Sequence, residues 1–277
     1  MATVLQDDRI ARADTAADNF RAVTPEEIAH YREFGWAKLE NFVQPAMVRR
    51  LLEVGVEKLG EDGDSNPPLP ILQDLFNHAY ADALNDPTLR PLLNNLGKNA
   101  KALMQRRPHV EVRYFTENFA VKLPAGKESK HAGNGRTEFH HDFPNWQLDR
   151  SGGMAFWIAL KDMGPDMGTM SFVNGSHRLG VLGNYRNGDL LELYPEILER
   201  CTLSDPMTYE AGDATVHSSL TVHGAGFNLT DRPRWAYTVL LNPADARWNG
   251  APAEAYDTTH MTVHQELDDE RFPILSR

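Results

Sequence analysis

The chain has 277 residues, 41% of them hydrophobic and 24% charged, which is the composition of a globular protein able to bury a core. Its formal net charge of −11 at pH 7 argues against nucleic acid or an anionic membrane surface as a partner, because both are recognised through basic patches. The single cysteine, Cys201, leaves no pair for an internal disulfide or a zinc site.

The N-terminal residues predict a tail followed by one domain. Residues 1–22 are polar and alanine-rich without a helical or strand period, so we expect a flexible tail. They contain no apolar run, so we expect neither a signal peptide nor a membrane span, and the predicted location is cytoplasmic. Between residues 23 and 277 no linker is long enough to divide the chain, which favours a single domain. The oligomeric state stays open.

A capping box marks the first helix of this domain. Thr24 is an N-cap residue, Pro25 suits the first helical position, and Glu27 is the acidic residue that completes the box. Gly35 supplies the stop signal. Residues 36–40 alternate between apolar and other side chains, which predicts a short strand after the helix.

Further helices are predicted up to about residue 105. Pro45 opens a helix that should run to about Leu59, with its apolar residues on one face. Residues 61–70 are rich in glycine, proline and aspartate and predict a loop. Helical spacing returns over residues 71–104, interrupted by two prolines and by Gly97.

From about residue 110 the pattern changes to short extended runs separated by turn residues. The predicted strands are residues 110–123, 153–160, 169–173, 207–209, 214–216 and 235–241. Leucines in the segment 189–200 predict a short helix between strands. Helices first and many strands afterwards indicate a mainly β fold with flanking α, in which N-terminal helices buttress an antiparallel double-sheet, jelly-roll core.

The residues that carry chemistry centre on His140 and Asp142, which are separated by one residue. On a strand this spacing places an imidazole and a carboxylate on the same face, and His141 between them points away, which makes it a control position. With one more histidine the pair forms a 2-His-1-carboxylate facial triad, which holds Fe(II) and leaves open positions. In a chain with 11 histidines such a pair also arises by chance, and an exposed strand-end pair is the alternative.

Two downstream histidines, His217 and His223, are candidates for the third ligand. We favour His223, because Gly224 and Gly226 follow it and allow the backbone to turn sharply beside a ligand. Eleven residues later, Arg234 is suited to hold the far carboxylate of a bidentate co-substrate such as 2-oxoglutarate. A surface arginine at a turn is the alternative for this position.

These residues and their surroundings resemble the phytanoyl-CoA dioxygenase family of Fe(II)/2-oxoglutarate oxygenases. The resemblance rests on residues 24–28, 34–36, 122–124, 140–142, 157–162, 168, 173–178, 212–213, 217, 223–224 and 234, in this order. It implies a double-stranded β-helix fold of the cupin-like kind. It also implies that His140, Asp142 and His223 bind Fe(2+) and are catalytic, with 2-oxoglutarate and O2 as co-substrates.

The resemblance further implies which residues bind 2-oxoglutarate. Lys122 and Trp157 are expected to contact it together with Arg234. Members of the family often have serine or threonine two residues after the second metal histidine, where a hydroxyl helps to hold 2-oxoglutarate. Ala225 stands at this position, so Thr221 or Lys122 is expected to supply the missing contact.

The loop after Asp142 is similar to that of ectoine hydroxylases, where it borders the substrate. The expected substrate-binding residues are Phe143, Asn145, Trp146, Arg113 and Asn118. This lining suits a small molecule with a polar handle and an apolar part, such as a metabolite or a natural-product intermediate. An acyl-CoA fits less well, because the chain offers little positive charge for its phosphates. The fold itself does not fix the substrate.

The implied reaction couples oxidative decarboxylation of 2-oxoglutarate to hydroxylation of an unactivated C–H bond. Halogenating relatives have a small residue at the position of Asp142, so the carboxylate here favours hydroxylation, desaturation or ring chemistry. Two alternatives stay open. A cupin-like metal enzyme that does not use 2-oxoglutarate would not need Arg234, and a non-catalytic relative would bind metal without turnover.

Overall fold

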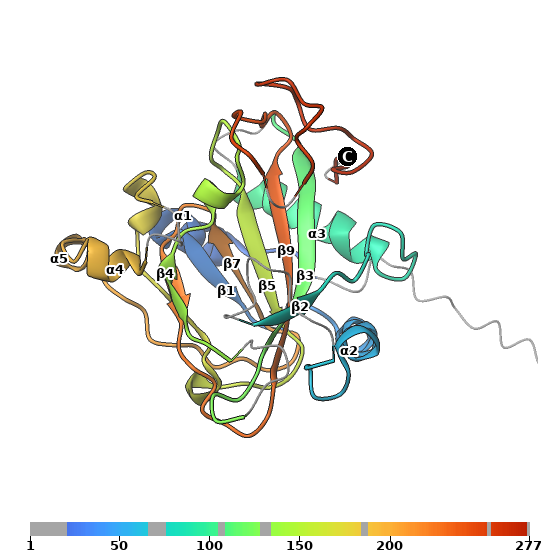
Figure 1. The fold of residues 1–277 in the computed structure, drawn as a ribbon, viewed down its shortest axis with the longest axis vertical. Coiled ribbons are helices and arrows are strands. Elements are labelled where there is room, and N and C mark those ends of the chain that lie inside the picture. The colour runs from blue at the N-terminus through green and yellow to red at the C-terminus, as the bar shows by residue number, and fades with distance from the viewer. Residues whose placement is uncertain are drawn as a thin grey trace, which may run out of the picture.

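The computed structural model describes residues 21–65, 76–104, 109–127, 134–183, 188–253 and 256–275. The predicted tail, residues 1–22, lies almost entirely outside the described residues, as do parts of the predicted loop at 61–70 and of the predicted helical stretch at 71–104. Within the described residues, helices precede a core of two antiparallel sheets, as the order of the sequence signals predicted (Figure 1). None of the described helices is long and apolar enough to cross a bilayer.

Helix α1, Pro25–Phe34, begins and ends at the predicted signals. The Thr24 hydroxyl accepts a hydrogen bond from the amide of Glu27, and the Glu27 carboxylate accepts one from the amide of Thr24, which completes the capping box. Gly35 ends the helix with a φ of 85°, a conformation that residues with a side chain rarely adopt. A Cβ at Gly35 would also lie 2.5 Å from the Thr221 hydroxyl, so the position requires glycine.

Helices α2, Pro45–Leu59, and α3, Arg90–Leu103, pack against the large sheet, and α2 has the predicted bounds. The prediction of a helical stretch from residue 71 is wrong for the described residues before α3. Strand β2, Asn77–Ala79, pairs there with β3, because the edge of that strand offers hydrogen bonds that local helical spacing does not reveal. Gly97, a predicted break, lies inside α3.

The described strands form a large sheet of six strands and a small sheet of three. The large sheet has the order β1 (Trp36–Leu39), β7 (Ala214–Ser218), β5 (Met154–Ala159), β9 (Arg234–Pro243), β3 (Val112–Lys122) and β2. The small sheet has the order β4 (Thr137–His140), β8 (His223–Ala225) and β6 (Met170–Phe172). The predicted strand at 207–209 forms a single bridge, from Tyr209 to Met163, and β8 was not predicted.

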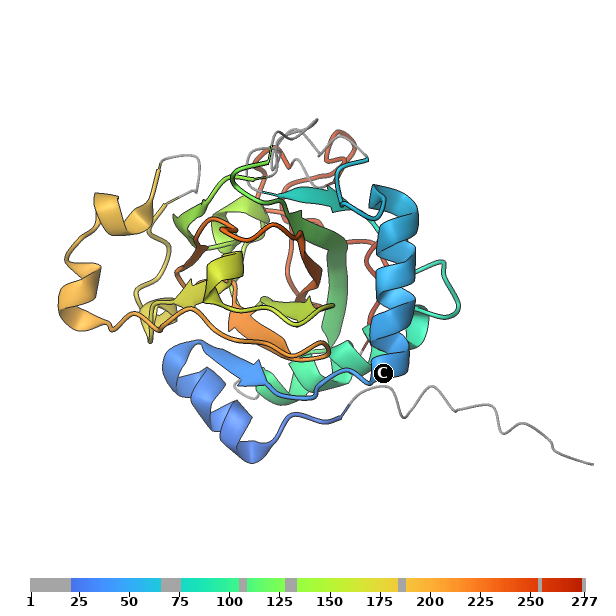
Figure 2. The same ribbon diagram turned by 90° about the horizontal axis from the view of Figure 1, so that it is seen from below.

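The two faces of the large sheet have different partners. The outer face packs on α2 and α3 in an apolar core that includes Phe119 and Phe156. The inner face, which carries Trp157 and Ala236, packs with Phe172 of the small sheet. This arrangement is the predicted double-sheet core with flanking helices, and in Figure 2 the helices in blue and teal lie outside the strands.

The segment between β6 and β7 projects from the side of the small sheet (Figure 1). It contains two short helices, α4 (Leu190–Leu193) and α5 (Ile197–Arg200), where the sequence predicted one. The Asp189 carboxylate accepts hydrogen bonds from the amide of Leu191 at 2.9 Å and from the amide of Phe139 on β4 at 3.1 Å. The projecting segment is therefore fastened to the strand that leads into the predicted metal ligands.

Candidate metal and co-substrate site

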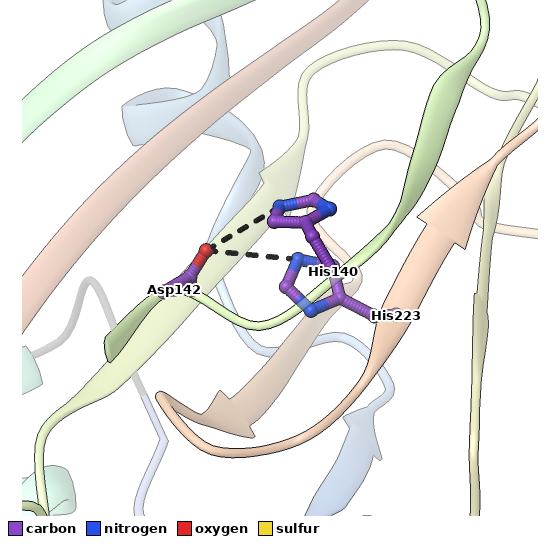
Figure 3. Close-up of side chains that lie close together, drawn as sticks. All are labelled: His140, Asp142 and His223. Atoms are coloured by element: carbon purple, nitrogen blue, oxygen red, sulfur yellow. Dashed lines mark ion pairs between the residues drawn. The ribbon is translucent and has the colours of Figure 1, made fainter. Parts of the chain in front are cut away.

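The structure brings His140, Asp142 and His223 together between neighbouring strands of the small sheet (Figure 3). His140 on β4 and His223 on β8 are register partners, and one ligand atom from each of the three residues lies within 4.8 Å of the others. Asp142 Oδ1 is 3.6 Å from His140 Nε2 and 3.9 Å from His223 Nε2. The three predicted ligands therefore converge on one point.

Backbone carbonyls orient both imidazole rings of this group. His140 Nδ1 lies 2.7 Å from the carbonyl oxygen of Glu138, and His223 Nδ1 lies 3.0 Å from that of Thr221. Because a carbonyl oxygen only accepts hydrogen bonds, each Nδ1 carries the proton, and in a neutral ring Nε2 presents its lone pair. Two such lone pairs face a carboxylate oxygen, an arrangement that a metal cation or a proton between them stabilises. The donor set therefore fits a divalent metal ion.

The electrostatics of the group favour the protonation states that a metal needs. Burial opposes ionisation of Asp142, but the surrounding histidines outweigh it and hold its pKa well below the ordinary value. Burial and the neighbouring histidines lower the pKa of His223 well below its ordinary value, so this ring is neutral. Burial also opposes charging of His140, yet Asp142 outweighs it and raises the pKa of His140. A proton on His140 and a metal ion are therefore alternative partners of the carboxylate.

His217, the other candidate for the third ligand, contacts the opposite oxygen of the carboxylate. Its Nε2 is 3.3 Å from Asp142 Oδ2, and its buried Nδ1 has no hydrogen-bond partner among the described residues. Because the carboxylate is an acceptor, Nε2 of His217 carries the proton and donates it. This geometry favours His223 as the ligand and makes His217 a residue that orients Asp142, a role that sequence spacing alone does not reveal.

Removing the hydrogen bond from His217 is expected to weaken metal binding without abolishing it. We expect His217→Phe to raise the Fe(II) dissociation constant about 10- to 100-fold, the range observed when a residue that orients a metal ligand is lost. His217→Gln, which keeps an N–H donor at a similar reach, should bind nearly as tightly as the wild type. Anaerobic metal titration measures both. A loss as complete as that of His223→Ala would instead make His217 a ligand.

Arg234 and Lys122 face each other across β9 and β3 on the inner face of the large sheet. Both are buried, Arg234 Nη1 donates to the carbonyl of Gly168, and Lys122 Nζ donates to that of Gly226 at 2.8 Å. Burial lowers the pKa of Arg234 to about 10, and burial together with the charge of Arg234 lowers that of Lys122 to about 6. No carboxylate of the described chain contributes to the pKa of either group, so the buried guanidinium charge has no carboxylate to balance it.

Trp157 lies beside this arginine, whereas Thr221 is engaged elsewhere. The Arg234 guanidinium carbon is 5.2 Å from the centre of the Trp157 ring. The Thr221 hydroxyl donates to the carbonyl oxygen of Gly35 at 2.7 Å, so its proton links the metal-binding segment to the end of α1. The structure therefore groups Arg234, Lys122 and Trp157 and leaves Thr221 without a proton to donate to a co-substrate.

The predicted substrate residues fall into two groups. Asn118 on β3 and Phe143 and Asn145 in the 3-10 turn η2 (Phe143–Asn145) are half-buried and keep accessible surface. Trp146 is buried against Phe115, with ring centres 5.6 Å apart. Arg113 is also buried, and its Nη1 binds Asp269 at 2.6 Å and the carbonyl of Phe272. The latter two side chains already have partners within the protein.

His141, between two predicted ligands, points away from the metal group, as the strand alternation predicted. Its ring is fully buried, and Nε2 contacts the projecting segment, 2.9 Å from the carbonyl oxygen of Gly183 and 3.3 Å from the amide nitrogen of Leu182. Substitution of His141 would therefore release this segment, so His141 is unsuitable as the neutral control that the sequence suggested.

Comparison with known proteins identifies the family. The family model described as phytanoyl-CoA dioxygenase matches residues 20–236, which is most of the chain. The chain belongs to the phytanoyl-CoA dioxygenase family. The family predicted from the sequence is confirmed, and with it the enzyme class: members are 2-oxoglutarate-dependent non-haem iron enzymes. No curated protein sequence matches the chain significantly.

Several solved structures share the fold of this dioxygenase-family chain. The non-haem α-ketoglutarate-dependent carbocyclase SnoK from nogalamycin biosynthesis is 24% identical, with a TM-score of 0.72, covering 94% of this chain and 97% of SnoK. The epimerase SnoN from the same biosynthesis is 22% identical, with a TM-score of 0.68, covering 90% and 97%. EctD from S. alaskensis is 18% identical, with a TM-score of 0.64, covering 85% and 82%.

Bound groups in these structures match the predicted cofactors. SnoN has been solved with Fe3+, α-ketoglutarate and nogalamycin RO, and EctD with 2-oxoglutarate and 5-hydroxyectoine. Iron and 2-oxoglutarate are thus the cofactor and co-substrate of this class, and the predicted jelly-roll fold is confirmed.

Proposed function

We propose that this protein is an Fe(II)/2-oxoglutarate-dependent dioxygenase that hydroxylates an unactivated C–H bond of a small-molecule metabolite or natural-product intermediate, with release of succinate and CO2. The observation that carries the proposal is that a cation-binding ligand set on the small sheet occurs together with a buried, uncompensated guanidinium on the large sheet. On the small sheet, His140, Asp142 and His223 present a ligand set that suits a cation, and on the large sheet the buried guanidinium of Arg234 has no carboxylate partner among the described residues and suits an anion. An iron ion chelated by 2-oxoglutarate supplies both.

The protein's own residues divide the work of this reaction. Iron with 2-oxoglutarate supplies the activation of dioxygen and the removal of hydrogen from the substrate. His140, Asp142 and His223 would hold the metal on one face, which leaves the other face for ligands. His217 orients the carboxylate, and Arg234, which lies beside Trp157, would hold the distal carboxylate of the co-substrate.

We further propose that the substrate binds along the inner face of β3 and β9. Alternate residues on these strands, Thr116, Asn118, Thr238 and Leu240, keep accessible surface, while their neighbours on the outer face are buried. Together with Phe143 they offer hydroxyl, amide and apolar contacts. Such a lining fits a small molecule with hydrogen-bonding groups on an apolar frame. We also propose that residues 23–277 form a single domain and that the protein is cytoplasmic.

A second candidate reaction is ring closure or epimerisation, which the names of SnoK and SnoN favour. Product analysis separates the candidates, because all of them begin with hydrogen removal. Hydroxylation adds an oxygen atom, ring closure or desaturation removes two hydrogen atoms, and epimerisation leaves the mass unchanged. We expect a product that has gained oxygen from O2, as followed with labelled dioxygen.

The test of the proposed function is succinate release across a substrate panel. Protein loaded with Fe(II) is supplied with 2-oxoglutarate, O2 and candidate metabolites, and succinate is measured against substrate consumed. We expect the two amounts to match for the true substrate. Product formed without 2-oxoglutarate would support the cupin-like alternative, and Fe(II) binding without turnover of any substrate would support the non-catalytic one.

Binding of 2-oxoglutarate is expected to be coupled to proton uptake by Lys122. With a pKa of about 6 the amine is mostly neutral at about pH 7.5, and an adjacent carboxylate would restore its charge. Anaerobic Fe(II)-loaded protein should therefore take up close to one proton for each 2-oxoglutarate bound. Calorimetry in buffers of different ionisation enthalpy measures this uptake. We expect Lys122→Met to abolish it, and an unchanged uptake would assign the proton to another group.

A further inference from the structure

At Ala225 the co-substrate site has no hydroxyl, whereas relatives often have one there, so another group must supply this contact. Two buried hydroxyl groups near Arg234 have no hydrogen-bond partner among the described residues, those of Tyr209 and Thr215. Buried hydroxyls are nearly always satisfied, and one without a partner is destabilising. The two hydroxyls lie close enough to act on each other, but one hydrogen bond between them uses only one of their two protons, so at least one requires a partner that the described chain does not provide.

Thr215 is fixed beside Trp157 by the register of the large sheet. It lies on β7 directly opposite Trp157 on β5, and cross-strand partners place their side chains on the same face of a sheet. That face is the inner one, on which Trp157 contacts the Arg234 guanidinium. Thr215 is fully buried, so its hydroxyl lies in the interior beside Trp157, which contacts the arginine.

Tyr209 reaches the same place from the loop before β7. Its ring centre is 5.1 Å from that of Trp157, and it belongs to the apolar cluster that also contains Ala225 and Ala236. Burial raises the pKa of Tyr209, while the hydroxyl of Thr215 and the charge of Arg234 act in the opposite direction. The phenol therefore stays protonated at neutral pH and is available as a donor.

The positive charge of Arg234 and the nearby hydroxyl donors indicate that the ligand at this position is an anion. Arg234 is a buried cation without a counter-ion, and its Nε also has no partner among the described residues. A carboxylate has about four lone-pair sites, so after a guanidinium fork it still accepts hydrogen bonds from hydroxyl groups. We propose that Tyr209 and Thr215 donate hydrogen bonds to the distal carboxylate of 2-oxoglutarate and replace the hydroxyl that is absent at Ala225. This inference rests on the proposed function.

Paired substitutions test the two hydroxyls separately from the shape of the pocket. Tyr209→Phe and Thr215→Val remove one hydroxyl each, and Thr215→Ser keeps it. In anaerobic Fe(II)-loaded protein we expect the first two to raise the dissociation constant of 2-oxoglutarate about tenfold or more, and Thr215→Ser to stay near the wild-type value. The control is Tyr237→Phe, which removes a buried phenol hydroxyl beside Glu117 on the outer face of β9, away from the co-substrate site.

A second ligand shows which end of 2-oxoglutarate the hydroxyls hold. 2-Oxobutanoate has the same chelating end but no distal carboxylate, so its affinity should be unaffected by Tyr209→Phe and Thr215→Val. Equal weakening of both ligands, or unchanged 2-oxoglutarate affinity in both variants, would overturn the inference and leave the proposed function intact. Wild-type protein that binds Fe(II) but not 2-oxoglutarate would overturn the proposed function as well. Fe(II) affinity and thermal unfolding of each variant verify that it is folded.

Discussion

Asp142→Ala is expected to abolish product formation and to weaken Fe(II) binding by about a thousandfold, because several kcal/mol of metal stabilisation are lost with the carboxylate. Asp142 supplies the one negative charge of the predicted ligand set, and both predicted histidine ligands face its Oδ1. Its loss also leaves the donor on His217 without an acceptor. Anaerobic Fe(II) titration and succinate release at controlled metal concentration measure the two effects.

The control for this experiment is an aspartate outside the site. Asp205 is exposed in the segment before β7, and Asp205→Ala should leave both metal affinity and turnover unchanged. His141 does not serve, because its ring is buried and bonded to the projecting segment. Turnover of Asp142→Ala at the wild-type rate, with metal supplied in the same way, would remove Asp142 from the triad.

Arg234→Ala is expected to raise the dissociation constant of 2-oxoglutarate about a hundredfold to a thousandfold while leaving Fe(II) affinity unchanged. The guanidinium is fully enclosed between the sheets, and losing one partner of a buried ion pair costs about 3–5 kcal/mol. Arg234→Lys should recover part of the affinity, because an ammonium keeps the charge but lacks the planar fork. Calorimetric titration of anaerobic Fe(II)-loaded protein measures the change.

Arg232 is the matched control for Arg234. It lies two residues earlier, is exposed to solvent, and carries the same charge. Arg232→Ala should bind 2-oxoglutarate as the wild type does. If Arg234→Ala also binds normally and still forms product, Arg234 is dispensable, and the cupin-like reaction without 2-oxoglutarate becomes the better explanation.

Local signals in the sequence predicted those parts of the fold that depend on neighbouring residues. The capping box at Thr24 and the glycine at the end of α1 satisfy backbone groups within a few residues, so the helix could be located without knowledge of its surroundings. The extended runs that became β5 and β9 had the same basis, because turn residues bound them in the sequence. Strand β2 depends instead on pairing with β3, whose paired residues lie 40 to 44 positions away, and the local helical spacing misled the prediction.

The site shows the same division between local spacing and distant contacts. Spacing predicted that His140 and Asp142 share a face, and the family resemblance supplied the order of the remaining residues. The partner of Arg113 is Asp269, 156 residues away, so the sequence offered no sign that this arginine was already paired. The sequence likewise provided no reason to select Tyr209 and Thr215, because only the folded structure places both beside Trp157.

The attachment of the projecting segment to β4 has a consequence for how related enzymes diverge. The Asp189 carboxylate accepts a hydrogen bond from the amide of Phe139, and the carbonyl of Gly183 contacts the ring of His141. The projecting segment is therefore attached to the residues on both sides of His140. Residues outside the metal site thus help to position the strand that carries His140. Selection acting on this outer segment is expected to tune metal affinity while every ligand remains the same.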